Sequence, residues 1–291
     1  MIAGIDIGGT QVRVAAARSD GRIVATKRAR TGSLGGPAGL IEWACEALEG
    51  LRDGERLRVV AIGAPGPLDS RRGTLINPPN LPGWHNVPLA EHLSRLLSCP
   101  VHLENDANLA ALAEYHRGAG RGTRTMAYVT WSTGVGGGLV VDGRLFGGAH
   151  GSAGEIGHMV LDPDGPLDAC GQRGCVEAFC GGGALQRETG ESAAEIFAAS
   201  ASGDRQARLI VQRAGTYMGY ALVNLTNLFD PEVIVVGGGV TRSWSQVEPV
   251  MKAVLHGSPF IRPARRPRLK RARLGERVGE VGAVEWARAN L

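Results

Sequence analysis

The sequence has no run of roughly 18 uncharged apolar residues, so it contains nothing typical of a membrane-spanning helix. Residues 1–6 also lack the basic segment and the long apolar stretch that begin a secretory signal. We therefore expect a soluble cytoplasmic protein without a membrane partner. Hydrophobic residues make up 43% of the chain and charged residues 21%, which excludes the hydrophobicity-poor, highly charged composition of disordered proteins.

Two widespread nucleotide-binding motifs are missing as well. The chain has no Gly-x-x-x-x-Gly-Lys-Ser/Thr segment and no Gly-x-Gly-x-x-Gly segment, which disfavours a P-loop ATPase and a dinucleotide-dependent enzyme. Glycine itself is abundant, with 44 residues that gather mostly in short loops between apolar runs. Such loops are typical of backbone that approaches a ligand.

Acidic residues are absent from 262–273, where seven basic residues lie. A basic run of this kind can bind nucleic acid or another anionic partner, but the alternation at 266–273 also describes a strand with one solvated basic face. No aromatic residues stand between these charges to stack on bases. We therefore expect a strand at this position and no nucleic-acid partner.

The apolar pattern indicates an α/β protein that contains a duplication. Three strand-like runs open the chain, at 2–7, 11–18 and 22–28, and helical and strand-like segments then alternate. The pattern begins again with strands at 126–132 and 138–141, separated by the glycine-rich segment 133–137. A long helix, a buried strand and a closing helix are expected at 205–228, 233–236 and 281–289. The repetition predicts two similar lobes that face a cleft.

Two glycine-rich hairpins are candidates for phosphate binding. In the first, an apolar strand delivers Asp6 to a turn at which Gly8, Gly9 and Thr10 can approach phosphate oxygens, while Asp6 can hold a hydrated Mg²⁺ ion. Segment 132–138 repeats this arrangement. Its candidate residues are Thr133, Gly134, Gly136 and Gly137. Either segment alone also fits an ordinary β-hairpin, but the pair predicts a polyphosphate that is held from both sides.

A third glycine-rich segment, 237–239, follows an apolar strand and precedes a helix. Gly237 and Gly238 are therefore candidates for further nucleotide contacts near a helix N-terminus.

Three of the five cysteines fall within eleven residues, which is typical of metal binding and not of a disulfide framework. Cys170 and Cys175, arranged around two glycines, can form a knuckle that offers two thiolates to a tetrahedral ion. His158 is placed to be a third ligand and Asp168 the fourth. We interpret Cys180 as a small buried residue.

The segment 104–108, Glu-Asn-Asp-Ala-Asn, lies where a strand ends and a helix begins. Taken locally, Asp106 is a good N-cap for that helix, and Asn105 is another.

Together these segments resemble the ROK family (repressors, open reading frames, kinases), in the family's order and over essentially the whole chain. The segments that carry the resemblance are Asp6–Thr10, Ala64–Pro67, Asn80–Trp84, Glu104–Asn108, Ser132–Gly138, Gly154–His158, the cysteine knuckle and Gly282–Ala283. The resemblance implies the actin/hexokinase-like (ribonuclease H-like) duplicated fold. We expect a small lobe of 1–116 with 280–291, and a large lobe of 117–279.

The resemblance also implies an ATP-dependent sugar kinase in which Mg²⁺ accompanies ATP. Carried over by position, Asp106 is the general base, and the sugar hydroxyls are bound by Asn80, Asn105, Asp106, Glu155, His158 and Glu177. His158 would also ligate a structural Zn²⁺ with Cys170 and Cys175. We expect glucose, phosphorylated at its 6-hydroxyl, with N-acetylmannosamine and N-acetylglucosamine as alternatives. Homodimers or homotetramers are implied as well.

Two positions depart from the family pattern. The first cysteine of the usual Cys-x-Cys-Gly-x-x-Gly-Cys is Asp168 here, which replaces a soft ligand by a hard one. Gln11 stands where a lysine often follows the first hairpin, which removes one charge near the nucleotide. A sugar-responsive repressor is a competing hypothesis, but only three residues precede Gly4, which leaves no DNA-binding segment. A silent sugar-binding protein is disfavoured by the presence of Asp6 and Asp106.

Overall fold

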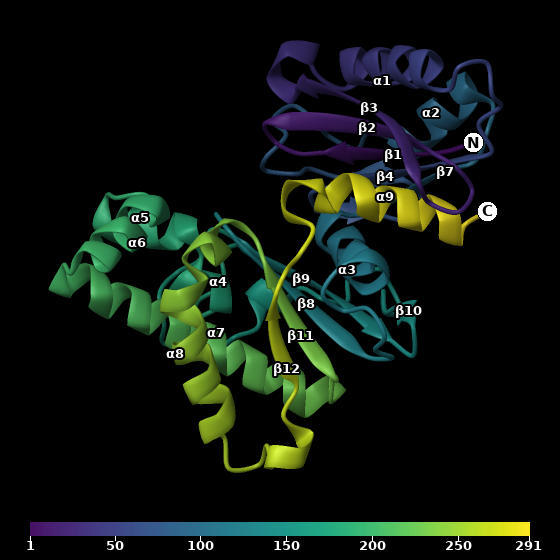
Figure 1. Cartoon of the computed structure of the whole chain (residues 1–291). Helices are drawn as coiled ribbons and strands as arrows, with labels where there is room; N and C mark the ends of the chain where they lie inside the picture. Colours follow the sequence, from purple (N-terminus) through teal and green to yellow (C-terminus); the bar gives the residue numbers. More distant parts are fainter. The chain divides into compact units, whose positions relative to one another are not determined.

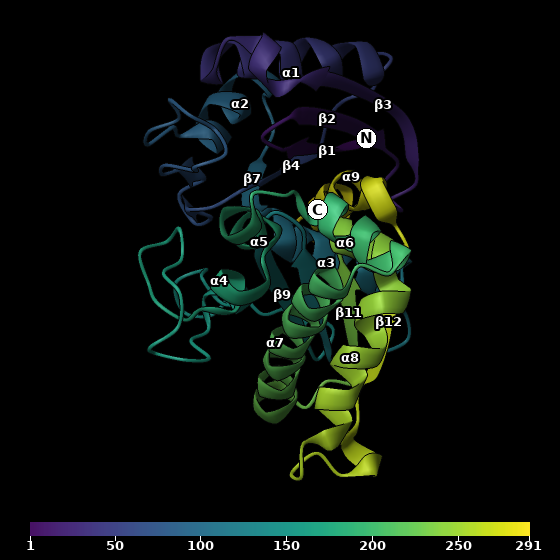
Figure 2. The same ribbon diagram turned by 90° about the vertical axis from the view of Figure 1, so that its left-hand side faces the viewer.

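The computed structural model describes residues 1–291, and the chain divides into two compact units. Unit 1 comprises 1–116, 148–151 and 276–291, and unit 2 comprises 117–147 and 152–275. Each unit has its own five-stranded sheet (Figures 1 and 2). Each also has its own hydrophobic core. No helix combines the length and the apolar character that a membrane crossing requires.

The sheet of unit 1 has the strand order β3-β2-β1-β4-β7. Its central strand, β1 (Ile2–Ile7), runs antiparallel to β2 (Gln11–Ala17) and parallel to β4 (Val59–Ala64). The outer strands are β3 (Ile23–Arg30) and β7 (Val101–Asn105). The remaining short strands of this unit are β5 (Leu68–Asp69) and β6 (Thr74–Leu75).

Helices cover both faces of this sheet because successive side chains of a strand point to opposite faces. Ile5 and Ile7 pack with α1 (Pro37–Leu51) and α2 (Leu89–Leu97), whereas Ile2 packs with α9 (Val278–Ala289). Other elements of the unit are α3 (Asp106–Arg117) and the short helices η1 (Thr31–Leu34) and η5 (Gly275–Arg277). Gly4 lets α9 approach, since a Cβ there would lie 2.8 Å from the backbone of Val284.

Unit 2 repeats the topology of unit 1. Its strand order is β10-β9-β8-β11-β12, and its central strand β8 (Met126–Trp131) has one antiparallel and one parallel neighbour. The other strands are β9 (Val135–Val141), β10 (Arg144–Leu145), β11 (Val233–Gly237) and β12 (Arg268–Arg271). The predicted α/β duplication is thereby confirmed.

The second hairpin is tighter than the sequence predicts. Strand β9 begins at Val135, so Gly136 and Gly137 pair with Thr130 and Val129 of β8 and do not form the expected loop over 133–137. The physical reason is packing, because a Cβ at Gly137 would lie 2.1 Å from the side chain of Ile156. Glycine in this strand admits a close neighbour.

Helices of 5 to 25 residues pack against the sheet of unit 2. The helices are α4 (Val176–Cys180), α5 (Gly182–Thr189), α6 (Ala193–Ser202), α7 (Arg205–Phe229) and α8 (Trp244–Gly257), with the short helices η2 (Ile156–His158), η3 (Gly239–Ser243) and η4 (Pro263–Arg265). Helix α7 begins at the N-cap Asp204, whose carboxylate accepts from Ala207 N–H at 2.7 Å. Met218 and Leu222 of α7 lie in the unit's core.

Part of the basic run 262–273 forms the edge strand β12, which is shorter than the alternation over 266–273 predicts, and 263–265 form the short helix η4. Arg268 and Arg271 are exposed, while Leu269 packs against the core. Charged side chains on an edge strand oppose pairing with a foreign strand. The single solvated basic face that we expected is not formed, because Lys270, on the same face as Arg268, is half-buried and its Nζ donates to the Ala119 carbonyl at 3.0 Å, whereas Arg271 on the opposite face is exposed.

Helices α7 and α8 approach closely at Gly219, where a Cβ would lie 2.6 Å from Cβ of Val254. We predict that Gly219→Ala lowers the free energy of unfolding by about 1–3 kcal/mol through overpacking, although alanine is the better helix former. Chemical denaturation followed by circular dichroism measures this. Gly50→Ala is the matched control, because a Cβ on that α1 residue meets open space. A Gly219→Ala protein as stable as the unsubstituted chain would contradict the close contact.

Candidate active site

The first glycine hairpin lies in unit 1, between β1 and β2. Gly8 N–H donates to the Gln11 carbonyl at 2.9 Å, and Thr31, which the sequence did not single out, donates its hydroxyl to the Gly8 carbonyl at 2.7 Å. A Cβ on Gly9 would lie 3.0 Å from the Asn80 carbonyl. The structure thus brings the predicted sugar-binding residue Asn80 beside the predicted phosphate hairpin.

Asp6 is the penultimate residue of β1 and lies on the face that α9 covers. Its Oδ2 lies 3.3 Å from Arg13 Nη1, and Arg13 Nη2 donates to Gln11 Oε1 at 3.2 Å. Burial raises the pKa of Asp6, Arg13 opposes that rise, and Glu280 adds to it. Arg13 therefore supplies a cation at this hairpin, where Gln11 replaces the family's lysine.

Asp106 is the first residue of α3, but it is not the cap of that helix. Asn105 Oδ1 accepts from the N–H groups of Ala107 (2.9 Å) and Asn108 (3.3 Å), which is the N-cap pattern. The local interpretation of Asp106 as the cap is therefore wrong, and the alternative, Asn105, is correct. The Asp106 carboxylate also accepts from Ala107 N–H, at 2.8 Å, but only Asn105 accepts from both N–H groups.

Glu104 supports the junction between β7 and α3 with a buried side chain. Its Oε1 accepts from Asn105 N–H at 2.8 Å and from Asn108 Nδ2 at 2.9 Å. Burial raises the pKa of Glu104, and the two hydrogen bonds oppose the rise. Sequence reasoning included Glu104 and Asn108 in the motif but assigned them no role. Their separation by four residues around a helix start was the available signal.

The second hairpin lies in unit 2 and is contacted by Glu177 of α4. Val135 N–H donates to Glu177 Oε2 at 2.6 Å, and a Cβ on Gly134 would lie 2.4 Å from the same oxygen. The predicted sugar-binding carboxylate is thus joined to the predicted phosphate hairpin. Helix η2 also lies on β9, since a Cβ on Gly157 would lie 2.0 Å from the Val135 carbonyl. Glu155 is the N-cap residue of this short helix and His158 is its last residue.

A pocket of about 440 Å³ opens beside the turn of this hairpin. It is lined by Ser132, Thr133, Gly182, Gln186, Ser192, Ala193, Ala194, Phe197, Ala198, Ala201, Gly239, Val240, Arg242, Ser243 and Gln246. Gly239, from the glycine-rich segment 237–239, is one of these lining residues. Gly237 and Gly238 instead pack on β8, where a Cβ would meet Tyr128 and Trp131 respectively.

Helix α5 forms one wall of this pocket, a role that sequence reasoning missed. Gly182 N–H donates to the Ser132 carbonyl at 2.8 Å, and Gly183 N–H donates to the Thr133 carbonyl at 2.7 Å. The glycine run at 181–183 was a signal of the same kind as 237–239. Because α5 begins directly on the hairpin, the turn and the pocket wall are held together.

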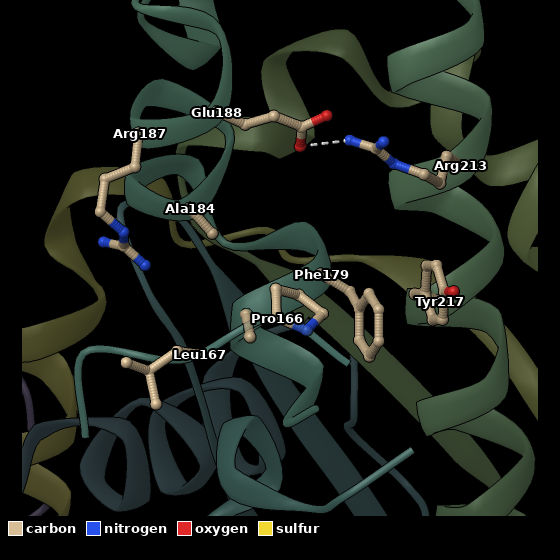
Figure 3. A pocket seen from close by; sticks show the side chains of 9 residues that line it. Pro166, Leu167, Phe179, Ala184, Arg187, Glu188, Arg213 and Tyr217 are labelled. Atoms are coloured by element: carbon tan, nitrogen blue, oxygen red, sulfur yellow. Dashed lines mark hydrogen bonds and ion pairs between the residues drawn. The ribbon is translucent and has the colours of Figure 1, made fainter. Parts of the chain in front are cut away.

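A second hollow of unit 2, of about 490 Å³, lies between α5, α7 and the segment that precedes the cysteines (Figure 3). Phe179 and Tyr217 stack inside it, with ring centroids 3.8 Å apart. Arg213 is paired with Glu188, and Arg187 lies at the edge near Leu167 (Figure 3).

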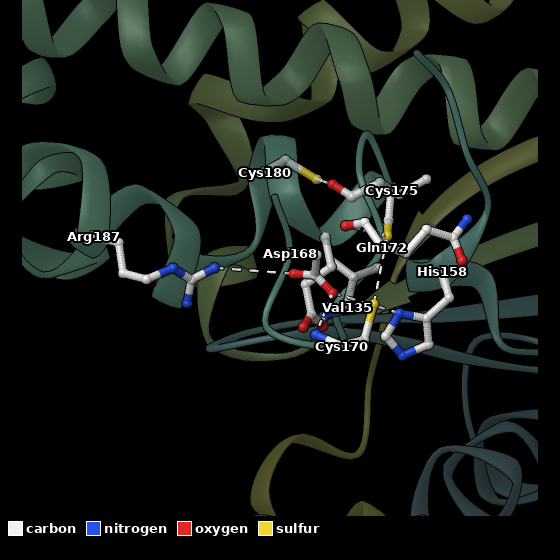
Figure 4. Close-up of polar contacts among 10 residues, drawn as sticks. Val135, His158, Asp168, Cys170, Gln172, Cys175, Cys180 and Arg187 are labelled. Carbon is white, nitrogen blue, oxygen red and sulfur yellow. Dashed lines mark hydrogen bonds and ion pairs between the residues drawn. The ribbon is translucent and has the colours of Figure 1, made fainter. Parts of the chain in front are cut away.

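The four predicted metal ligands lie together in unit 2 (Figure 4). One ligand atom from each of His158, Asp168, Cys170 and Cys175 is within 4.8 Å of the other three. The thiols of Cys170 and Cys175 are 3.7 Å apart. One imidazole, two thiols and one carboxylate are a donor set that suits tetrahedral Zn²⁺.

Backbone and burial shape this cluster. Gly171 and Gly174 have left-handed φ values of 89° and 68°, which turn the chain between the two cysteines. Burial and the contact with Cys170 raise the pKa of the Cys175 thiol to about 12, so a metal ion has to displace its proton. Cys180 is fully buried and its thiol donates to the Val176 carbonyl at 3.1 Å, which confirms that it is a buried residue outside the cluster.

Comparison with known proteins places these features in a family. The model of the ROK family matches residues 2–290. A glucokinase of Thermotoga maritima is 35% identical over 82% of this chain and 82% of its own, and an N-acetylmannosamine kinase of Yersinia pestis is 34% identical over 99% and 98%.

Solved structures agree with the sequence relatives. A ROK hexokinase from Thermus thermophilus has a TM-score of 0.90 and 37% identity, covering 99% of this chain and 98% of that one. A ROK glucokinase from Streptomyces griseus, in complex with glucose and AMPPNP, has a TM-score of 0.80 and 32% identity, covering 99% of each. The chain therefore belongs to the ROK family and has the actin/hexokinase-like fold of its hexokinases.

Proposed function

We propose that this protein is an ATP-dependent hexose kinase that transfers the γ-phosphoryl group of ATP to the 6-hydroxyl of glucose. The observation that carries the proposal is the pocket beside the second hairpin, because it combines a glycine turn suited to phosphates with an apolar wall suited to a purine. Relatives named glucokinase, one of them solved with glucose and AMPPNP, support this assignment.

The nucleotide would lie with its base among Ala194, Phe197 and Ala198 and its phosphates beside Ser132 and Thr133, the residues of the turn that line the pocket. A planar base packs well against apolar side chains, while backbone N–H groups of a glycine turn bind phosphate oxygens. In unit 1, the turn at 8–10 is also proposed to bind phosphate oxygens. Asp6 would hold the Mg²⁺ ion that accompanies ATP.

The acceptor hydroxyl would be activated by Asp106. Phosphoryl transfer requires positioning and charge neutralisation, with one base to accept the hydroxyl proton. A carboxylate in the first turn of α3 is stabilised in its ionised form by the helix dipole, which keeps it ready to accept that proton. The buried hydrogen bond between Asn108 and Glu104 would keep the junction between β7 and α3 rigid.

The hydrogen bonds within each unit leave defined atoms for the sugar. Asn105 uses Oδ1 for the helix cap, so its amide Nδ2 would donate to a hydroxyl. Glu177 uses Oε2 for Val135, so Oε1 would accept from one. Asn80, Glu155 and His158 are the other residues that we propose for sugar binding, and neutral and acidic side chains of this kind suit an uncharged polyol.

The cluster of His158, Asp168, Cys170 and Cys175 would hold a structural Zn²⁺ ion. Such an ion fixes the positions of its ligands. It would therefore fix His158 and the start of α4, which carries Glu177.

Phosphorylation of N-acetylmannosamine is the second candidate activity, because a relative named N-acetylmannosamine kinase is 34% identical over 99% of this chain. A panel of both sugars with ATP distinguishes the two.

The role of Asp106 predicts a loss of turnover without a loss of binding. Asp106→Asn should lower kcat by roughly 10²–10⁴-fold while glucose affinity measured by calorimetry changes little. Because Asn105 is the helix cap, the substitution should leave the melting temperature near that of the unsubstituted protein. Asp53→Asn, at an exposed turn, is the control. If Asp106→Asn turned over normally, Asp106 would not be the general base.

The pairing of Asp6 with Arg13 predicts a pH effect. Arg13 lowers the pKa of Asp6 against the larger effect of burial, so Arg13→Met should raise that pKa further. The carboxylate needed for Mg²⁺ would then be lost at a higher pH as the solution is acidified. The acid limb of kcat/KM for Mg·ATP should therefore move to higher pH. Arg28→Met, directly opposite Arg13 in β3, is the control. An acid limb that does not move, or moves to lower pH, would contradict the pairing.

The metal proposal predicts about one zinc ion per chain by elemental analysis. Removal with a chelator should lower the melting temperature and raise the KM for glucose roughly tenfold, with a smaller effect on kcat, because the ion supports sugar binding and not the transfer step. Cys170→Ser should lose the metal, whereas Cys45→Ser should keep it. Metal-free protein with an unchanged KM for glucose would rule out this role.

A further inference from the structure

The two oxygens of the Asp168 carboxylate lie in different surroundings. Oδ2 faces the ligand cluster, 3.7 Å from His158 Nδ1 and 3.3 Å from Cys170 N. Oδ1 faces away from it and is buried without a hydrogen-bond partner. The whole side chain has 0% exposure, so bulk solvent does not reach this oxygen. A carboxylate oxygen in that position needs a donor or a cation nearby.

Arg187 is the arginine that approaches this oxygen. Its Nη2 lies 3.9 Å from Asp168 Oδ1, and Figure 4 shows the guanidinium extended toward the carboxylate from the side opposite His158. The side chain is 54% exposed and borders the hollow of Figure 3, so it reaches Asp168 from solvent. Its helix, α5, is held at its start by the hydrogen bonds of Gly182 and Gly183 to the second hairpin.

A cation beside the metal site would balance the net charge of the ligand set. A divalent ion with one neutral imidazole, two thiolates and one carboxylate leaves about one net negative charge in a largely enclosed cluster. A carboxylate that binds through one oxygen also keeps charge on the other. A thiolate at position 168 would have no second acceptor atom.

We propose that Arg187 is the positioning residue that allows a carboxylate to act as the fourth zinc ligand in this chain. It would hold Asp168 by Oδ1 so that Oδ2 faces the ion, and it would balance the negative charge of the ligand set. The inference rests on the zinc site of the proposed function. It predicts that the contribution of Arg187 to metal affinity depends on the residue at position 168.

A double-mutant cycle tests this dependence. Zinc affinity is measured by competition with a chelator of known affinity, without sugar or nucleotide, for the unsubstituted chain, Arg187→Met, Asp168→Cys and the double variant. Arg187→Met should weaken zinc binding by roughly 10–100-fold in the Asp168 chain and by less than about threefold in the Asp168→Cys chain. Arg187→Lys, which keeps the charge, should give an intermediate loss.

Arg213→Met is the matched control. Arg213 borders the same hollow but pairs with Glu188, so its removal should leave zinc affinity unchanged. Melting temperatures of all variants, measured with bound metal, confirm that each is folded.

Equal losses in the two backgrounds would overturn the inference, because Arg187 would then support the fold of the loop and not the carboxylate. The inference would also be overturned if Arg187→Met did not weaken zinc binding in the chain with Asp168. It would be overturned too if the Asp168→Cys chain bound zinc and the unsubstituted chain did not. A chain that shows the expected cycle but phosphorylates no sugar would keep the inference and reject the kinase proposal.

Discussion

Close backbone contact at the β8–β9 hairpin positions most of the candidate site in unit 2. Gly137 and Gly157 leave no space for a Cβ, so η2 lies directly on β9 and carries His158 with it. The same hairpin receives α5 through two backbone hydrogen bonds and α4 through Glu177. Packed backbone is stiff, since the interior transmits displacement instead of absorbing it. The turn, the pocket wall and the metal ligand His158 are therefore held by one piece of structure.

Three buried or half-buried carboxylates show a second common constraint. Asp6 is paired with Arg13, Glu104 accepts two hydrogen bonds, and Asp168 is approached by Arg187. Burial alone favours the neutral acid, so each carboxylate needs a specific partner to remain ionised. The partners come from a neighbouring strand, from the next helical turn, or from a separate helix. Charge in this protein is placed by tertiary neighbours as much as by the motifs that contain the acids.

Local motifs predicted well wherever the chemistry is contained in a few consecutive residues. The hairpin at 6–10, the cysteine knuckle and the basic edge strand were all found where their turns, spacing or alternation indicated. Less predictable was the distribution of roles inside a motif. Asn105 and Asp106 are both good caps, and only the geometry of the strand end decides that Asn105 is the one used. Likewise, glycine at 136 and 137 indicated a loop, but both residues lie in a strand because a distant segment packs on Gly137.

The sequence by itself determined the duplicated α/β architecture, the two glycine hairpins and the identity of the four candidate metal ligands, because periodicity, turn residues and ligand chemistry are local properties. The tertiary structure alone decided that Gly239 lines the pocket while Gly237 and Gly238 pack on β8. It also brought α6 to that pocket and Arg187 to Asp168. These pairs join segments whose proximity depends on how the helices pack on the sheet, and no local pattern encodes that contact.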